Sequence, residues 1–388
     1  MLSRLVHSRA GAILLTLAIM ASYALFADLR AKHSWDSIPY TALVLSLDEP
    51  YGPRIHLRTY ALLEQALSAD QYRKLTNATP FRQQVHRSWE ALRQQLPLFA
   101  IKPLYVIAAY GFYKLGLSPV DGLVWVSVLS TILLAIGLTA WFYRYLPGLA
   151  ASVTAVGLLV VTGALFVGNI ARPAALSGLL LAACAYFIWA KPSYRWALVT
   201  AIASVLARPE NLLFALLIAV YLRWFADPTA RIRPPTMLLA VVAATGIYWF
   251  VEHHYGAYGW QLTFYYAFVD KLPYPEGREI VLTLSDYLRR LWWSVLEEGT
   301  SLQLGVFVVY VTGATYLALR SQTTSVRYWF AGCVLLCMAH ILVYPSLNVR
   351  FFVPYYLLIA SAAVAVFLSE RKGDRRRTGL ERANEGLG

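Results

Sequence analysis

Apolar blocks alternate with short polar breaks along almost the whole chain. The first block covers about 10–29, and the others cover about 97–117, 120–143, 149–169, 173–190, 195–207, 211–225, 234–251, 301–319, 327–345 and 351–369. Most of them approach the ~20 residues that a helix needs to cross a bilayer. The pattern predicts an all-α polytopic membrane protein with about 10–12 transmembrane helices. An odd number of blocks cannot keep both termini on one side, so we expect the block beginning at Leu98, or one around 195–225, to be half-inserted or broken.

Two long polar segments, about 30–96 and 252–300, interrupt this pattern. The first contains two amphipathic stretches, 55–75 and 80–96, in which apolar residues such as Leu62, Leu63 and Leu67 recur near helical spacing. We expect these stretches to be interfacial helices that lie in the plane of the membrane surface. Residues 1–369 then form a single membrane domain, and the charged segment 370–388 is a basic, disordered cytoplasmic tail.

Charge indicates the sidedness of the chain. Of the 388 residues, 59% are hydrophobic, mean hydropathy is +0.52 and the net charge is +13. Basic residues gather at the N-terminus (Arg4, Arg9), at 191–195, 223–233 and 320–327, and in the tail. Because cytoplasmic loops carry the excess of Lys and Arg, both termini are expected inside and both long polar segments outside. This sidedness accounts for the positive charge without a nucleic-acid partner.

The usual metal and nucleotide motifs are missing from the sequence. The three cysteines, Cys184, Cys333 and Cys337, lie inside apolar blocks, which disfavours disulfides and a zinc site. A divalent cation, Mg²⁺ or Mn²⁺, held by Asp36 and a second acid such as Glu49, Glu210 or Glu252 remains open, and no cofactor is assigned beyond it. Without a Gly-rich phosphate loop or a Gly-x-Ser-x-Gly elbow, a soluble nucleotide donor is not expected.

Asp36 is the first candidate for chemistry. It lies between Trp35 and Tyr40, where the chain leaves the bilayer on the outer side. A carboxylate held in a partly dry cleft can act as a general base toward a hydroxyl or an amine. The alternative is an N-cap or a solvated loop carboxylate.

Four cations stand at the edges of apolar blocks on the same expected side. Lys102, before Pro103, either snorkels to the interface or binds a phosphate. Arg172 and Arg208 each precede a proline between two apolar blocks, where the break exposes backbone groups to a cavity. Arg208 either pairs with Glu210 to close a turn or binds phosphate with Glu210 orienting it. Arg350, near Tyr355, is either an interfacial anchor or a bidentate phosphate clamp.

In their order and sidedness these features resemble the GT-C superfamily of membrane glycosyltransferases, and within it the branch of the protein O-mannosyltransferases and the lipid A aminoarabinose transferase. The residues that carry the resemblance are Asp36, the two amphipathic stretches, Lys102-Pro103-Leu104-Tyr105, Arg208-Pro209-Glu210 and Arg350-Phe351-Phe352-Val353-Pro354. The resemblance implies that Asp36 is the catalytic base, that Lys102 helps to bind the donor phosphate, and that the donor is a sugar on polyprenyl phosphate or diphosphate. The family has Lys-Pro-Pro where this chain has Lys102-Pro103-Leu104, and no Asp-Glu pair stands beside Asp36.

We therefore expect an inverting glycosyltransferase in a bacterial inner membrane, surrounded by membrane lipids. It moves a sugar from a polyprenyl-phosphate-linked donor to an envelope glycan, lipid or protein at the outer face. Besides Lys102, the substrate-binding residues are expected to be Tyr40, Arg172, Arg208, Glu210, Arg350 and Tyr355. Arginine and lysine would stabilise the departing phosphate, opposite the base. Two alternatives remain: a transporter or flippase for a lipid-linked sugar, and a scaffold subunit of an envelope polysaccharide system.

Overall fold

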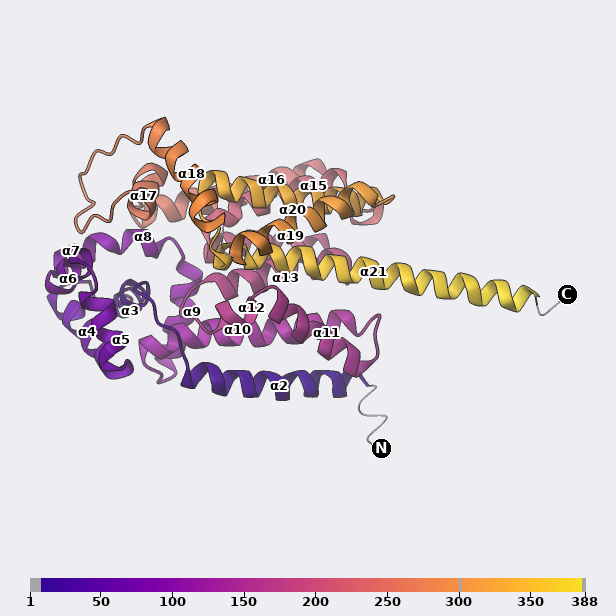
Figure 1. Ribbon diagram of the computed structural model, residues 1–388, viewed down its shortest axis with the longest axis horizontal. Coiled ribbons are helices and arrows are strands. Elements are labelled where there is room, and N and C mark those ends of the chain that lie inside the picture. The colour runs from indigo at the N-terminus through magenta and orange to yellow at the C-terminus, as the bar shows by residue number, and fades with distance from the viewer. Residues whose placement is uncertain (1–7, 300–301, 386–388) are drawn as a thin grey trace.

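The computed structural model describes residues 8–299 and 302–385, and every regular element in those ranges is a helix (Figure 1). Arg4 and the last three residues of the expected tail lie outside the described residues. Within the described ranges, six helices are long and apolar enough to cross a membrane: α2 (Arg9–Leu29), α10 (Pro119–Phe142), α16 (Pro234–His254), α19 (Leu302–Arg320), α20 (Thr324–Val343) and the Val349–Arg371 part of α21 (Val349–Glu385). The chain is thus a multi-pass α-helical membrane protein, as the apolar blocks predict.

Fewer helices reach spanning length than the blocks suggest, because several blocks are divided or short. Block 149–169 forms α11 (Gly148–Val161) and α12 (Ala164–Gly168), separated at Gly163, whose φ of 77° ends the first helix. The blocks that follow form α13 (Ala174–Trp189), α14 (Tyr194–Ala207) and α15 (Leu212–Trp224). At 1.5 Å per residue the 14 residues of α14 extend ~21 Å, less than the ~30 Å hydrocarbon core.

The block beginning near Leu98 is broken, as expected for one of the blocks in doubt. The helical stretch Trp89–Ala100 and α9 (Pro103–Lys114) meet at 111°. Pro103 has no backbone N–H to donate and disfavours helical geometry at Lys102, whose ψ is 57°. Lys102 therefore lies in an irregular turn between two helices.

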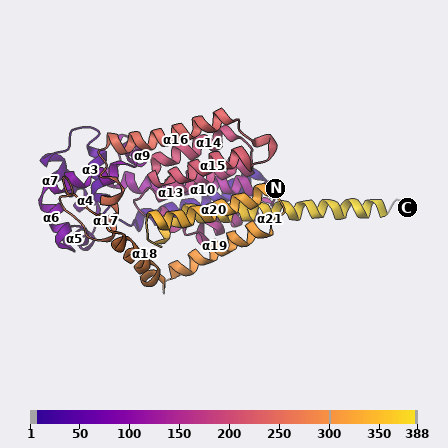
Figure 2. The same cartoon turned by 90° about the horizontal axis from the view of Figure 1, so that it is seen from above.

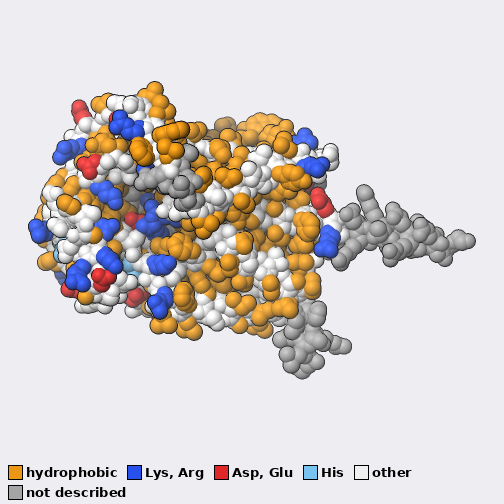
Figure 3. All heavy atoms as spheres, viewed as in Figure 1, with side chains coloured by type: hydrophobic (Ala, Val, Ile, Leu, Met, Phe, Trp, Pro, Cys, Tyr) orange, Lys and Arg blue, Asp and Glu red, His pale blue; other side chains and the backbone are white. Residues whose placement is uncertain are grey.

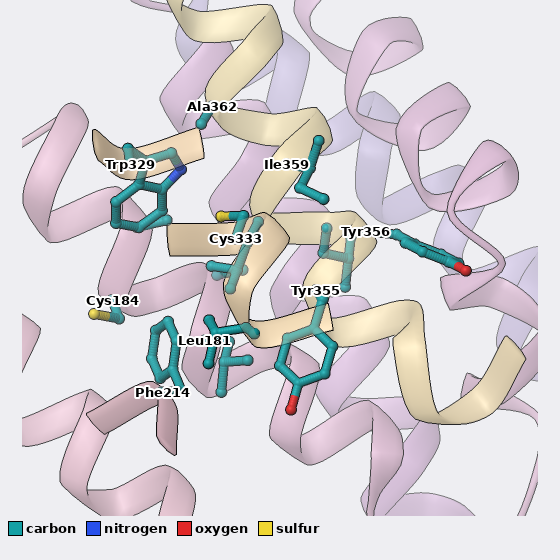
Figure 4. Close-up of a cluster of buried hydrophobic side chains, with 14 of the residues drawn as sticks. Leu181, Cys184, Phe214, Trp329, Cys333, Tyr355, Tyr356, Ile359 and Ala362 are labelled. Atoms are coloured by element: carbon teal, nitrogen blue, oxygen red, sulfur yellow. The ribbon is translucent and has the colours of Figure 1, made fainter. Parts of the chain in front are cut away.

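The spanning helices pack around one apolar core. Side chains from α13, α15, α20 and α21 meet there, including Leu181, Phe214, Cys333 and Ile359 (Figure 4). Figure 3 shows a broad, mainly orange band across the middle of the molecule, with charged side chains gathered toward the two ends. Helix α2 begins and α21 ends at the same end of the bundle (Figures 1 and 2).

The first polar segment builds a small core of its own at the other end. It forms α3 (Ser37–Leu45), α4 (Pro53–Ala66), α5 (Ala69–Asn77), α6 (Pro80–Arg87), α7 (Trp89–Gln95) and α8 (Pro97–Ala100). Leu63, Leu75, Phe81 and Val85 turn inward and are buried together. The two expected interfacial helices are thus four, and their apolar faces cover one another. Burial inside the protein accounts for an amphipathic pattern that we attributed to the membrane surface.

The second polar segment and the tail are also largely helical. The segment contains α17 (Gly259–Phe268) and α18 (Leu284–Gly299). Helix α21 continues past its apolar part through residue 385, into the charged segment that we expected to be disordered. That segment contains no proline, the residue most disruptive to a helix, although it does contain Gly373 and Gly379.

Candidate functional site

A cavity of about 400 Å³ opens between the first polar segment and the ends of the spanning helices. Its lining comes from seven parts of the chain that are distant in sequence, among them the α8–α9 break and the turns before α13 and α15. Seven of the eight residues singled out in the sequence line it: Asp36, Tyr40, Lys102, Arg172, Arg208, Glu210 and Arg350. Figure 3 shows blue and red side chains around a hollow in this part of the surface.

Asp36 contacts an arginine from a distant segment. The Nε of Arg172 lies 2.7 Å from Oδ2 of Asp36 and donates to Oγ of Ser34 at 3.1 Å. Asp36 does occupy the N-cap position of α3, but its side chain makes no capping hydrogen bond. The carboxylate is therefore directed toward the cavity and Arg172, and not toward the helix that follows it.

The backbone around this ion pair is joined across the two segments. Lys32 and Ile170 form a parallel bridge, in which the N–H of Lys32 donates to the carbonyl of Asn169 at 3.0 Å. The amide of Asn169 donates to the carbonyl of Arg30 at 3.1 Å. These bonds satisfy backbone groups that two chain breaks leave without helical partners, and they fix the position of Arg172 relative to Asp36.

Arg208 and Glu210 form the turn-closing ion pair that was one of the two expectations for them. Nε of Arg208 donates to Oε1 of Glu210 at 2.7 Å. Burial raises the pKa of Glu210, but the positive charges of Arg208 and Lys102 outweigh it and lower the pKa to about 2. The side-chain amide of Asn211 stabilises this turn, because it donates to Oγ of Ser177 at 2.8 Å and to the carbonyl of Ser204 at 2.9 Å.

Lys102 and Arg350 bring positive charge to the cavity without a paired carboxylate. Within the described part of the chain, neither makes a salt bridge. The ammonium of Lys102 donates to the carbonyl of Leu98 at 3.4 Å and lies 5.5 Å from the centre of the Phe99 ring. Nε of Arg350 is buried and has no hydrogen-bond partner among the described residues. The Cζ atoms of Arg350 and Arg208 lie 4.6 and 5.4 Å from the centre of the same Phe351 ring.

Tyr40 and Tyr355, the two tyrosines among the expected substrate contacts, differ in position. Tyr40 lines the cavity and packs edge-on against Tyr105, with ring centres 5.0 Å apart. Tyr355 does not belong to the lining; it is buried in the apolar core of α21 (Figure 4). Its ring lies 5.8 Å from that of His340, a lining residue, so Tyr355 packs behind the cavity wall and not at its surface.

Several lining residues were not singled out in the sequence as substrate contacts. They are Tyr248, Glu252, Trp260, Tyr266, Lys271, His340 and Tyr344. His340 is 4% exposed, and its Nε2 has no hydrogen-bond partner among the described residues. The position of His340 near the outer end of an apolar block could have marked it as a candidate from the sequence. Glu252, at the end of α16, was considered only as a metal ligand.

The charges of the lining do not balance. Asp36, Glu210 and Glu252 face Lys102, Arg172, Arg208, Lys271 and Arg350, so three acids meet five bases and an excess of +2 remains. No group of three or more His, Cys, Asp or Glu side chains able to hold a metal occurs among the described residues. An excess of partly buried positive charge favours an anionic ligand, and phosphate oxygens suit both Arg and Lys.

Comparison with known proteins gives no relative: no family model, no curated protein and no solved structure matches the chain.

Proposed function

We propose that the protein is a glycosyltransferase that uses a sugar linked to a polyprenyl phosphate as donor. The observation that carries the proposal is the joint presence, in one cavity, of an arginine-held carboxylate and an excess of cations. Asp36 is paired through one oxygen with Arg172, whereas Lys102 and Arg350 have no carboxylate partner in the described structure. The carboxylate held by Arg172 suits a general base, and the cations without a carboxylate partner suit a phosphate ligand.

The reaction assigned to the cavity is a single displacement. Asp36 takes the proton of the acceptor hydroxyl or amine as that group attacks the anomeric carbon of the sugar. The new glycosidic bond forms while the bond from the anomeric carbon to the phosphate oxygen breaks, and that oxygen keeps the electron pair. Lys102, Arg208 and Arg350 stabilise the charge that develops on the departing polyprenyl phosphate. Attack opposite the leaving group inverts the anomeric centre.

The finer aspects of fold and location belong to the same proposal. A GT-C-like membrane domain would have about 10–12 spans, if the shorter helices α11, α13, α14 and α15 are counted as tilted or partial crossings. The basic breaks at 191–195, 223–233 and 320–327 support cytoplasmic termini in a bacterial inner membrane, with the cavity outside. The acceptor would then be a glycan, lipid or protein of the envelope.

The test is sugar transfer by the purified protein in lipid nanodiscs. A panel of polyprenyl-phosphate sugars serves as donors, a mixture of envelope glycans, lipids and proteins serves as the acceptor, and release of polyprenyl phosphate is followed with each donor. We expect release with at least one donor and its loss in Asp36→Asn. The matched control is Glu49→Gln, which removes a carboxylate of the same polar segment that pairs with Arg54 and does not line the cavity. Wild-type release by Asp36→Asn would overturn the assignment of the base.

A transporter or flippase for a lipid-linked sugar is the second candidate. The observation that favours it is the helix break at Lys102, because broken helices at a polar cavity are a recurrent feature of transporter sites. Proteoliposomes separate the two functions. A transporter moves the lipid-linked sugar between leaflets without chemical change, whereas a transferase releases polyprenyl phosphate only when an acceptor is present.

A further inference from the structure

Helix α18 (Leu284–Gly299) shows an unusual distribution of exposed side chains. Five of its large apolar residues, Leu284, Leu288, Trp292, Trp293 and Leu296, are exposed, Leu284 by 72% and Trp292 by 63%, whereas Leu291 is half-buried. Leu284, Leu288, Trp292 and Leu296 recur every four residues and therefore lie along one side of the helix. Arg289 is also exposed beside them. An apolar stripe of this kind normally faces a core.

The other side of α18 contacts the protein, among other residues through Tyr287, Arg290 and Ser294. The hydroxyl of Tyr287 donates to the carbonyl of Leu342 at 2.6 Å, and that of Ser294 donates to the carbonyl of Pro345. Cζ of Arg290 lies 4.8 Å from the centre of the Phe268 ring. This side thus contacts the protein, and the stripe of exposed apolar residues faces outward, the reverse of a helix at a water-exposed surface.

The helices of the first polar segment provide the comparison within the same chain. Helices α4 to α7 are also amphipathic, but Leu63, Leu75, Phe81 and Val85 face one another and are buried. Those helices need no outside partner, because the protein itself covers their apolar faces. In α18, by contrast, Leu284, Leu288, Trp292, Trp293 and Leu296 remain exposed, which marks this side of the helix as a surface for an outside partner.

We propose that this side of α18 lies in the outer membrane–water interface and is covered by lipid. Figures 1 and 2 place α18 beside the ends of α19 and α20 that are nearest the polar segments. Helix α19, a candidate span, contacts α18 and exposes Leu302, Val308 and Val309, so the apolar surface continues from one helix to the other. Tryptophans prefer this depth, and Arg289 is available to lipid phosphate groups.

Lipid contact at α18 also bears on the cavity. Tyr287 packs against Trp260 and Phe264 of α17, with ring centres 6.3 and 5.6 Å away. Trp260, Thr263 and Tyr266 of α17 in turn form part of the cavity wall. Because α18 packs against α17, the depth of α18 in the membrane interface also sets the position of this part of the cavity wall relative to the membrane. This inference is independent of the reaction proposed for the cavity, and it holds equally for a transporter.

The test is the depth of a nitroxide label on the full-length protein in vesicles of phosphatidylethanolamine and phosphatidylglycerol. The label is attached in Trp292→Cys and, as matched control, in Trp89→Cys, whose tryptophan is 39% exposed in the first polar segment. The natural cysteines are buried, which directs the label to the introduced one. Collisions with oxygen report lipid, and collisions with a water-soluble nickel chelate report water.

We expect the oxygen-to-nickel collision ratio to be several-fold higher at position 292 than at position 89. The same measurement with Leu288→Cys, one turn away on the same side, should give a similarly high ratio and covers the case in which Trp292→Cys does not fold. Ratios at 288 and 292 equal to that at 89 would place α18 in water and overturn the proposal. Low collision rates with both reagents would mean that a protein covers the helix, which also overturns it.

Discussion

A single nitrogen of Arg172 contacts both the carboxylate of Asp36 and the hydroxyl of Ser34, two residues before Asp36 in the chain. This nitrogen, Nε, lies 2.7 Å from Oδ2 of Asp36 and 3.1 Å from Oγ of Ser34. The backbone next to Arg172 is in turn bridged, through Ile170, to Lys32, four residues before Asp36, so the two segments are joined at the main chain as well as at the side chains. For a group assigned as a base, this fixes the direction in which a proton can be accepted.

The first prediction concerns this orientation. Arg172→Lys keeps the positive charge but loses the planar Nε–H that contacts both partners, so Asp36 should turn away from the acceptor. We expect kcat for sugar transfer to fall roughly 10- to 100-fold, the range for a small misplacement of a reacting group, with little change in the KM for the donor. Arg54→Lys, whose arginine pairs with Glu49 on the exposed surface, is the control. A change in KM alone would contradict the positioning role.

The second prediction concerns the cations without a carboxylate partner. Lys102→Gln and Arg350→Gln should each weaken the binding of polyprenyl phosphate, measured by fluorescence titration in nanodiscs. A hydrogen bond to a charged group contributes about 1.5–3 kcal/mol, which corresponds to a loss of affinity of roughly 10- to 150-fold. Lys114→Gln is the control, because that ammonium pairs with Asp48 away from the cavity. If both cavity variants bind as tightly as the wild type, the phosphate is bound elsewhere.

The third prediction uses the orphaned nitrogen of His340. Nε2 is buried without a hydrogen-bond partner in the described structure, so removing it costs the free protein nothing. His340→Phe should therefore retain or increase thermal stability while it weakens polyprenyl-phosphate binding about 2- to 10-fold, the value of one lost hydrogen bond. His340→Gln, which keeps a donor, should bind more tightly than His340→Phe. A parallel loss of stability and binding in the Phe variant would indicate a purely structural residue.

The fourth prediction concerns acid sensitivity of the first polar segment. Burial lowers the pKa of both His56 and His86 from the ordinary value of 6.5, and the charge of Arg87 lowers that of His86 further. The unfolded segment binds these protons at about pH 6.5, but the folded one binds them only at lower pH. Stability should therefore decrease as the pH falls below about 6.5, because the unfolded state then holds more protons.

The measurement is thermal unfolding at pH 7.5 and pH 5.5. The loss of stability on acidification should be smaller in His86→Gln, whose histidine lies 4.5 Å from the Tyr60 ring in the small core. His253→Gln removes an exposed histidine at the end of α16 and should behave like the wild type. An equal loss in all three proteins would assign the acid sensitivity to other groups.

The membrane class and the main candidate residues followed from sequence because both depend on local signals. An apolar block is visible in one dimension, and a charge such as Lys102 or Arg208 at the edge of one is costly enough to need a reason. Seven residues singled out in the sequence, six of them charged, line one cavity. The break at Lys102 was also foreseeable, since Pro103 acts on its immediate neighbour.

What the sequence did not reveal depends on contacts between distant segments. An amphipathic stretch has an apolar face, but the pattern does not say whether protein or lipid covers it. For this reason 55–75 and 80–96 were assigned to the membrane surface, although their apolar residues form a core. Tyr355 was expected with its neighbour Arg350 as a substrate contact; in the structure it is buried behind the cavity wall, with its ring 5.8 Å from that of His340. Lys271 and Trp260 reach the cavity only through the path of the second polar segment.

Phe351 is apolar, but its ring contributes to the electrostatics of the cavity. Its ring lies within 5.4 Å of two guanidinium carbons, those of the adjacent Arg350 and of Arg208, which is more than 100 residues away in the sequence. The electron-rich face of an aromatic ring attracts cations, and this attraction lowers the cost of keeping two like charges close together before any substrate arrives. A hydropathy scale counts Phe351 as one more membrane residue. In this protein the same ring serves as a neutral counterpart for two positive charges, so the aromatic content of the chain contributes to its electrostatics as well as to its fit in the bilayer.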